Sequence, residues 1–305
     1  MIDFITTLLS ATLRIATPLL LATAGQILTQ RSGVINLGVE GIMLIGAFFG
    51  FFFAYISNNL LLGVLGALVM GGLLGLLMAF LTVTLGKNQT VSGIAIWMLG
   101  WGLSSLFLKV FFGLVSVSLP QRFPIISIPL LSQTPIVGVI FQQNILTYLS
   151  IVLAIVFGFI LFKTTLGLKI RSVGENPRAA DALGISVYRI RYLCVVLGGA
   201  MAGLGGAYLP LAEVGTFSEL MTAGRGWIVV ALVVFSKYSP YQAVSRALIF
   251  GAAIALSLQI QALGIVIPYQ FLLMIPYVLT LIVLAFTFKR TKPPGSIGVP
   301  FKRGA

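Results

Sequence analysis

The sequence predicts an all-α fold, a polytopic transmembrane helical bundle, and three observations point to it. First, 59% of the 305 residues are hydrophobic and only 8% are charged, whereas a soluble domain carries roughly 25% charged residues. Second, apolar runs recur along the chain at about the 20 residues that a helix needs to cross a bilayer. Third, most lysines and arginines stand beside these runs, where such residues orient spans and contact lipid headgroups.

The apolar runs indicate about nine spans, or eight to ten if two of them are irregular. Their approximate ranges are 4–28, 34–57, 60–85, 90–112, 144–162, 191–212, 220–236, 240–262 and 268–288. The loop 163–191 and the tail 289–305 hold the densest groups of basic residues, so both are expected on the cytoplasmic side. An odd number of spans then places the N-terminus outside and the C-terminus in the cytoplasm.

The seventh expected span, 220–236, is the least regular of the set. The apolar run from Trp227 to Ser236 is too short to cross about 30 Å of hydrocarbon. It crosses only if the helix begins near Leu220, with Arg225 reaching out from its outer end. The alternative is a half-span packed within protein, which bilayers tolerate away from lipid. Both interpretations are open at this stage.

Residue types that are missing exclude several classes of function. The chain reads as one transmembrane domain, 1–288, followed by a basic cytoplasmic tail, 289–305. It has no histidine, which excludes serine–histidine catalysis and histidine metal sites, so no catalytic residue and no metal are expected. Gly86-Lys87 is followed by Asn88 where a phosphate loop needs Ser or Thr. No cofactor is therefore expected on this chain, and any ATP is expected on a partner. The net charge of +13 lies beside spans, which indicates contact with the lipid bilayer and no nucleic acid.

One island of polar helix interrupts the apolar chain, at GENPRAADALGI (174–185). Asn176 can cap a helix, Pro177 suits its first turn and Gly184 can close it. The side chains between them form an apolar side of Ala179, Ala180 and Leu183 and a charged side of Arg178 and Asp181. So short a helix is not stable alone in water. It is either a helix that docks into a groove of another protein or an ordinary surface loop with a helical turn.

GENPRAADALGI resembles the coupling loop of importer permeases that work with an ATP-binding cassette protein, in the family that carries branched-chain amino acids, ribose-type sugars and nucleosides. Two more stretches are similar, VINLGVEGIMLIGAF (34–48) and GRGWIVVALVVFSKYSP (224–240). The NLGVEG run is most similar to the nucleoside branch. The resemblance implies a short cytoplasmic coupling helix that inserts into the ATPase. The residues it assigns to that coupling are Glu175, Asn176, Arg178, Ala179, Ala180, Asp181, Leu183 and Gly184.

The resemblance also implies partners and a location. An ATP-binding cassette ATPase supplies the energy, and a second, related permease, giving a heterodimer, completes the pathway. A substrate-binding lipoprotein or periplasmic protein delivers the substrate. The chain is then a multi-pass protein of the inner, cytoplasmic membrane.

Two ionisable residues stand inside expected spans, where a charge is costly and marks a functional candidate. Arg14 and Glu40 are expected at depths that differ by roughly 6 Å, from the rise of 1.5 Å per residue. We therefore expect them to form a buried pair or to share a polar network. The pair either fixes the packing of the first two helices or contacts the substrate.

Further polar and aromatic residues are candidates for the pathway. Asn36, with Gly38 and Gly41 nearby, opens the second span and favours either a broken helix that lines a cavity or a flexible helix start. Asn88 and Gln89 can simply cap the fourth span. Trp97 and Trp101 share one face at mid-depth, where they either pack in the core or stack on a purine or pyrimidine ring.

The sequence thus predicts the membrane-spanning permease subunit of an ATP-driven importer of a nucleoside, and not an enzyme. A ribose-type sugar or a branched-chain amino acid is an alternative cargo. An ion-coupled secondary transporter is the alternative class, although it would require several buried acidic residues and Glu40 alone qualifies. An intramembrane enzyme and a non-transporting assembly subunit are further alternatives.

Overall fold

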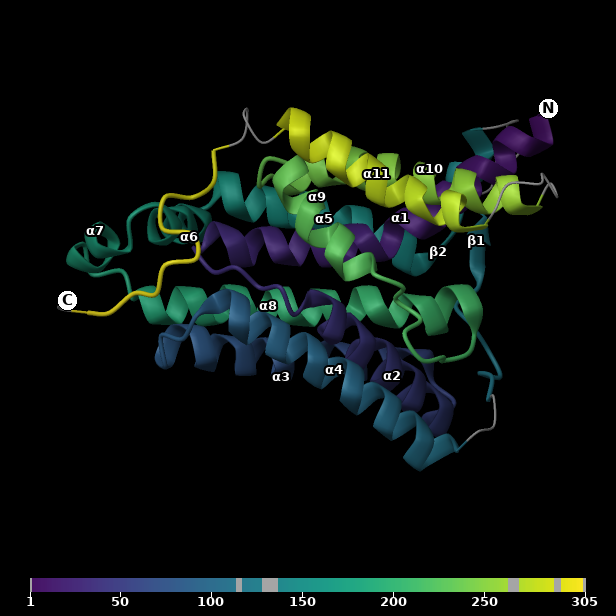
Figure 1. Cartoon of the computed structure of the whole chain (residues 1–305), viewed down its shortest axis with the longest axis horizontal. Coiled ribbons are helices and arrows are strands. Elements are labelled where there is room, and N and C mark those ends of the chain that lie inside the picture. The colour runs from purple at the N-terminus through teal and green to yellow at the C-terminus, as the bar shows by residue number, and fades with distance from the viewer. Residues whose placement is uncertain (1, 114–116, 128–136, 263–268, 288–291, 304–305) are drawn as a thin grey trace.

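The computed structural model describes residues 2–113, 117–127, 137–262, 269–287 and 292–303, which form an all-α bundle with one short strand pair (Figure 1). Strands β1 (Ile125–Ser127) and β2 (Gln142–Asn144) pair antiparallel, with Ile125 opposite Asn144. The two ends of the chain lie at opposite ends of the long axis.

The described helices fall into two groups by length. The long helices are α1 (Ile2–Arg31), α2 (Val39–Ser57), α3 (Leu60–Ala79), α4 (Gln89–Phe112), α5 (Ile145–Lys163), α8 (Val187–Tyr208), α10 (Pro240–Ala262) and α11 (Tyr269–Thr287). The shorter ones are α6 (Thr165–Glu175), α7 (Pro177–Ala182), α9 (Arg225–Phe235) and a 3-10 helix, Val137–Phe141. Helices α3 and α8 each continue into a π-helical turn, Phe80–Thr84 and Leu209–Val214.

Seven of the described helices are long and apolar enough to cross a bilayer, which confirms the membrane-bundle class. Helix α11 occupies the range of the last expected span. A full span at 220–236 is wrong, because α9 has 11 residues and is about 16 Å long at 1.5 Å per residue. The half-span alternative describes this segment. The span count, expected as eight to ten, and the orientation in the membrane stay predictions. The expected domain boundary at 288–289 lies outside the described residues.

Helix starts are fixed by side chains that accept hydrogen bonds from the first free amides. Asn88 accepts from the amides of Thr90 and Val91 at the start of α4, at 2.9 and 3.1 Å. Asn144 does the same for α5, where it accepts from the amide of Thr147 at 3.0 Å. These caps satisfy amides that have no partner within the helix. The simpler role expected for Asn88, a cap, is confirmed.

Glycines bring the central helices into backbone contact. Helix α8 packs against both α2 and α3, where Gly203 lies against Gly46 and Gly71. A Cβ atom at Gly203 would stand 2.4 Å from the carbonyl oxygen of Ala67, closer than any real contact. Membrane helices lack a hydrophobic drive to associate in lipid, so such close van der Waals packing holds them together.

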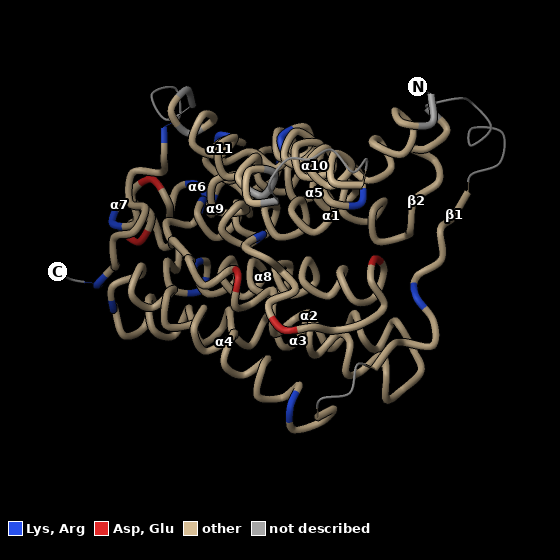
Figure 2. Tube along the Cα trace, turned by 45° about the vertical axis from the view of Figure 1, so that its right-hand side comes forward, with Lys and Arg blue, Asp and Glu red and all other residues tan. Residues whose placement is uncertain are grey.

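Basic residues gather at one end of the bundle. Figure 2 shows lysines and arginines around α6, α7 and the C-terminal end of the chain, and fewer towards the opposite end. This is the distribution that orients spans in a membrane. The end that carries α7 is therefore the one expected to face the cytoplasm.

Replacing Gly203 by valine tests the packing. We expect Gly203→Val to destabilise the protein by about 1–3 kcal/mol or more, the typical cost of overpacking a core. The matched control is Gly102→Val, because a Cβ atom at Gly102 meets nothing within 4 Å. Thermal unfolding in detergent measures both. Equal melting temperatures of the two variants would contradict the backbone contact.

Candidate functional site

Helix α2 begins inside the bundle rather than at its end. Residues 32–38, here named the entry segment, leave α1 and run without helical structure to Val39. Gly41 lies against α4 so closely that a Cβ atom there would be 2.6 Å from the Cα atom of Trp97. Trp97 lies about two turns into α4, which begins at Gln89. The start of α2 beside it therefore lies inside the bundle, and so does the non-helical entry segment that precedes α2. The interruption agrees with the broken helix expected around Asn36, and its role in lining a cavity stays a prediction.

Side chains satisfy the backbone of the entry segment. The Asn36 Oδ1 atom accepts from the amide of Gly38 at 2.8 Å, and the Gln89 Oε1 atom accepts from the amide of Ile35 at 2.7 Å. Asn36 and Gln89 are both buried. Gln89 therefore supports the interruption and does not serve only at its own helix start. The amide nitrogens of both side chains are buried without a described partner, so each has a donor left to offer.

The Glu40 carboxylate stabilises the start of α9. It accepts from the Thr222 hydroxyl, from the amide of Gly224 at 2.8 Å and from the amide of Gly226. The glutamate is 4% exposed. A Cβ atom at Gly226 would stand 2.5 Å from the Cα atom of Glu40, so only glycine permits this approach. The carboxylate thereby lies where the free amides and the dipole of a helix favour a negative charge.

The expected pairing of Arg14 with Glu40 is wrong. Arg14 is exposed on α1, while both Glu40 oxygens are occupied by residues of the α9 start. The physical reason is that a helix N-terminus can supply the positive potential that a buried carboxylate needs. Arg14 therefore does not belong to the polar network around Glu40.

All three tryptophans of the chain meet beside the start of α9. The rings of Trp97 and Trp101 stack at a centroid distance of 6.1 Å, and Trp227 meets Trp97 edge-on at 5.6 Å. Trp101 and Trp227 are 40% and 38% exposed, so this tryptophan cluster offers open ring surface. Trp97 and Trp101 pack on each other, but Trp101 is not buried in the core. Stacking on a solute, the other alternative, stays a prediction. Sequence reasoning missed Trp227, whose signal was its place directly after Gly226.

Polar groups lie next to the tryptophan cluster. Arg225, two residues before Trp227, donates to the carbonyl oxygens of Met221 and Thr222 at 3.1 and 3.3 Å, and its Nε atom is buried without a described partner. A Cβ atom at Gly224 would be 2.8 Å from the hydroxyl of Tyr277. Aromatic faces with adjoining donors can hold a flat ring that carries polar substituents.

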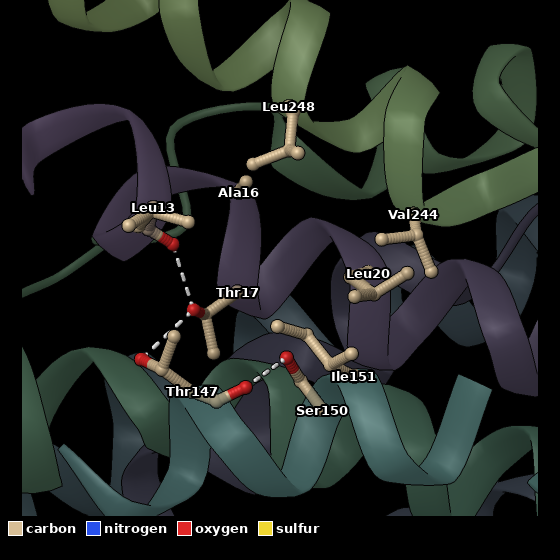
Figure 3. A pocket seen from close by; sticks show the side chains of 9 residues that line it. All are labelled: Leu13, Ala16, Thr17, Leu20, Thr147, Ser150, Ile151, Val244 and Leu248. Atoms are coloured by element: carbon tan, nitrogen blue, oxygen red, sulfur yellow. Dashed lines mark hydrogen bonds between the residues drawn. The ribbon is translucent and has the colours of Figure 1, made fainter. Parts of the chain in front are cut away.

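A small cavity lies away from this cluster, between α1, α5 and α10 (Figure 3). Its volume of about 30 Å³ suits a water molecule and is too small for a sugar or a nucleoside. The Thr17 hydroxyl lies 2.8 Å from the carbonyl oxygen of Leu13 and 3.1 Å from the hydroxyl of Thr147. This cavity is a packing feature with a polar wall, and it is not a passage for solute.

Helix α7 forms the polar helix expected at 174–185. Asn176 accepts from the amide of Ala179 at 3.0 Å, Pro177 is the first helical residue, and Gly184 has a left-handed φ of 80°. Leu183, at 81% exposure, projects freely. The helix with its flanks presents a row of exposed residues, namely Glu175, Asn176, Arg178, Ala179, Ala182, Leu183 and Gly184.

Ala180 does not belong to that exposed row, and its expected place in a partner's cleft is wrong. It is 2% exposed and packs with Val173, Val187 and Phe301 of its own chain. Asp181 is half-buried and pairs with Arg303, whose Nε atom lies 3.0 Å from Oδ2. The apolar side of the helix is thus divided, because Ala180 faces inwards while Ala179 and Leu183 face out.

Comparison with known proteins gives one family for nearly the whole chain. The family described as "Branched-chain amino acid transport system / permease component" matches residues 8–284. The guanosine ABC transporter permease protein NupQ of Bacillus subtilis is 38% identical, over 99% of this chain and 98% of its own. The nucleoside ABC transporter permease protein NupC of Lactococcus lactis is 36% identical over 94% and 93%. The putative glucose ABC transporter permease protein TsgC13 of Haloferax volcanii is 38% identical over 95% and 94%.

Removing the Glu40 carboxylate tests its role at α9. We expect Glu40→Ala to lower thermal stability in detergent, because three donors lose their acceptor and two of them, from Thr222 and Gly226, are buried, at about 1–3 kcal/mol each. We also expect tryptophan emission to shift, because all three tryptophans lie beside the start of α9. Glu219→Ala is the control, since its ion pair with Lys109 is exposed. Unchanged emission and stability in Glu40→Ala would contradict the capping role.

Proposed function

This chain belongs to the branched-chain amino acid transport system permease family, and on that premise we propose that it forms one wall of a nucleoside pathway in an ATP-driven importer. As a member of that family it is a multi-pass permease subunit of the cell membrane and not an enzyme. The proposal concerns the cargo, the partners and the residues that serve them.

The tryptophan cluster carries the proposal for the cargo. Two half-open indole rings within the transmembrane part of the chain offer stacking surface, and stacking of a nucleobase on an aromatic side chain contributes about 1–3 kcal/mol. Arg225, whose Nε atom has no described partner, would supply a hydrogen bond for a polar ring edge. Relatives named for guanosine and nucleoside transport, at 38% and 36% identity, point to the same cargo.

Interrupted helices support a pathway at this place. The entry segment before α2 and the residues before α9 leave the helical form beside the tryptophan cluster. In transporters, non-helical backbone at depth is tolerated where it lines a cavity or lies within protein. Because the tryptophans are partly exposed in the single chain, a second, related permease would close the pathway over them. A heterodimer would place two unequal walls around the cargo.

We propose that a separate ATP-binding cassette ATPase docks at α7 and drives transport by hydrolysing ATP. The exposed row on this helix offers one large apolar side chain, Leu183, among small and polar neighbours. That shape suits insertion into a cleft. Basic residues around α7 (Figure 2) support its placement in the cytoplasm. A substrate-binding lipoprotein or periplasmic protein would then deliver the nucleoside at the opposite end.

Glucose is a second candidate cargo, because a relative at 38% identity is named as a putative glucose permease. Sugars also pack on aromatic rings, so the tryptophan cluster alone does not exclude them. A ribose-type sugar and a branched-chain amino acid remain alternatives from the family. An ion-coupled transporter is disfavoured, because Glu40, the one buried carboxylate among the described residues, has both oxygens engaged by α9.

Uptake into vesicles that hold the whole complex tests the cargo. We expect ATP-dependent uptake of labelled guanosine that unlabelled nucleosides inhibit and glucose does not. Trp227→Ala should raise the KM for guanosine about tenfold, which corresponds to about 1.4 kcal/mol, with ATP hydrolysis retained. Trp227→Phe should restore most of the affinity. Phe159→Ala, on the exposed face of α5, is the control. Glucose uptake without nucleoside uptake would overturn the assignment.

Substitution of Leu183 tests the docking helix. We expect Leu183→Glu to abolish transport and co-purification of the ATPase, because a charged group replaces the one large apolar side chain of the exposed row. Leu183→Met should retain both activities. Membrane insertion, measured by yield in detergent, should be equal in the two variants. Normal transport by Leu183→Glu would exclude α7 as the docking site.

A further inference from the structure

The C-terminal residues 292–303, here named the tail segment, are bound to the bundle rather than solvated. Ser296 donates from its amide to the carbonyl oxygen of Gly174 at 2.9 Å, and Gly298 donates to that of Gly33 at 3.1 Å. The Ser296 hydroxyl lies 2.7 Å from the same Gly174 oxygen. The tail segment thus binds both the end of α6 and the entry segment, two regions about 140 residues apart in sequence. These regions also touch directly, where Gly174 lies against Arg31 and Gly33.

Arg191 binds both parts of this junction through its guanidinium. It lies near the start of α8 and is fully buried. Its guanidinium donates to the carbonyl oxygen of Ser32 at 3.2 Å, to that of Val299 at 3.1 Å and to the Ser296 hydroxyl at 3.4 Å. One side chain therefore binds the entry segment and the tail segment together. A planar group with five donors suits such a three-way contact.

The far end of the tail segment holds α7. Phe301 is buried in the cluster of Val173, Ala180 and Val187. Its ring meets that of Tyr188 edge-on at 5.8 Å, and the Tyr188 hydroxyl donates to its carbonyl oxygen at 3.4 Å. Two residues later, Arg303 pairs with Asp181 of α7. A helix of six residues is not stable alone, so its position depends on these contacts.

We propose that the tail segment is the link that transmits movement of α7 to the entry segment, and so to Glu40 and the start of α9. The route runs from Phe301 and Arg303 through Val299 and Gly298 to Gly33. The entry segment leads from there to Glu40, and its amides are held by Asn36 and Gln89. A displacement at Gly33 is therefore passed on rather than absorbed. This inference rests on the proposed docking of the ATPase at α7.

A competing account lets α7 act only through its covalent neighbours α6 and α8, with the tail segment as a passive cover. The two accounts differ in one measurable quantity, the number of substrate molecules transported per ATP hydrolysed. If the tail segment transmits the movement, removing its contacts with α7 lowers the ratio, while the ATPase still docks and hydrolyses ATP. A passive cover changes stability and leaves the ratio unchanged.

Phe301→Asp removes the buried contact between the tail segment and α7. The variant is tested in the full complex, reconstituted in vesicles with the ATPase and the second permease. We expect the ATPase to stay bound and to hydrolyse ATP at the wild-type rate, while guanosine transported per ATP falls at least tenfold. Phe301→Leu should restore the ratio. Lys292→Asp is the matched control, because that side chain is exposed at the start of the same segment and lies outside the route, and it should leave the ratio unchanged.

Ser296→Ala repeats the test in a chain that keeps Phe301. It should lower the ratio by a factor of about two to five, since the hydroxyl contacts with Arg191, Val173 and Gly174 are lost. An unchanged ratio in both Phe301→Asp and Ser296→Ala overturns the proposal. Equal losses of transport and hydrolysis in both also overturn it. Failure of the proposed function would look different, because the wild-type complex would then not transport guanosine or Leu183→Glu would be harmless.

Discussion

Backbone amides that no helix satisfies are the constraint on which this structure depends. Hydrocarbon offers them no water, so each interruption of a membrane helix must be satisfied from within the protein. The chain interrupts its helices before α2 and before α9, and it brings both interruptions together at Glu40. A single carboxylate accepts from the start of one helix while it sits in the first turn of the other. The two breaks therefore stabilise each other, and neither could be moved alone.

Glycine contacts around α8 place this arrangement in the bundle. Because Gly46, Gly71 and Gly203 let three helices touch through their backbones, α2 cannot slide along its axis to bring Glu40 elsewhere. Gly226 adds the last close contact, against Glu40 itself. The tryptophans then have fixed neighbours on one side and open surface on the other. Rigid packing behind an open aromatic face is suited to a wall along which a solute passes.

The sequence predicted the parts of this structure that depend on local pattern. Apolar run length placed most spans, because the cost of unsatisfied backbone in lipid leaves helices as the solution. Cap residues placed α7, because Asn176, Pro177 and Gly184 act on their own neighbours. The shortness of the run after Trp227 left the half-span open as an alternative, although a full span was expected there. Charge distribution predicted that the loop 163–191, which holds α7, and the C-terminal tail lie at the same end of the bundle, as Figure 2 shows.

Contacts between distant residues could not be predicted in this way. Depth alone suggested Arg14 as the partner of Glu40, whereas its donors come from residues 182 to 186 positions away, and they are amides that no residue type announces. Ala180 was expected to face a partner because nothing in its own helix shows that Phe301 covers it. Trp227 and Arg191 were missed for the same reason, since the partner surfaces that give them meaning arise only in the folded chain.

Burial of Arg191 has a consequence for how the protein is made. Its guanidinium is covered by Ser296 and Val299, which are 105 and 108 positions further along the chain. A ribosome therefore finishes the spans from α8 onwards before the groups that shield this cation exist. Until the tail segment docks, the guanidinium lacks its contacts with Ser296 and Val299. The complete burial of Arg191 is therefore a late step in the folding of this subunit, because it requires residues that follow the membrane helices.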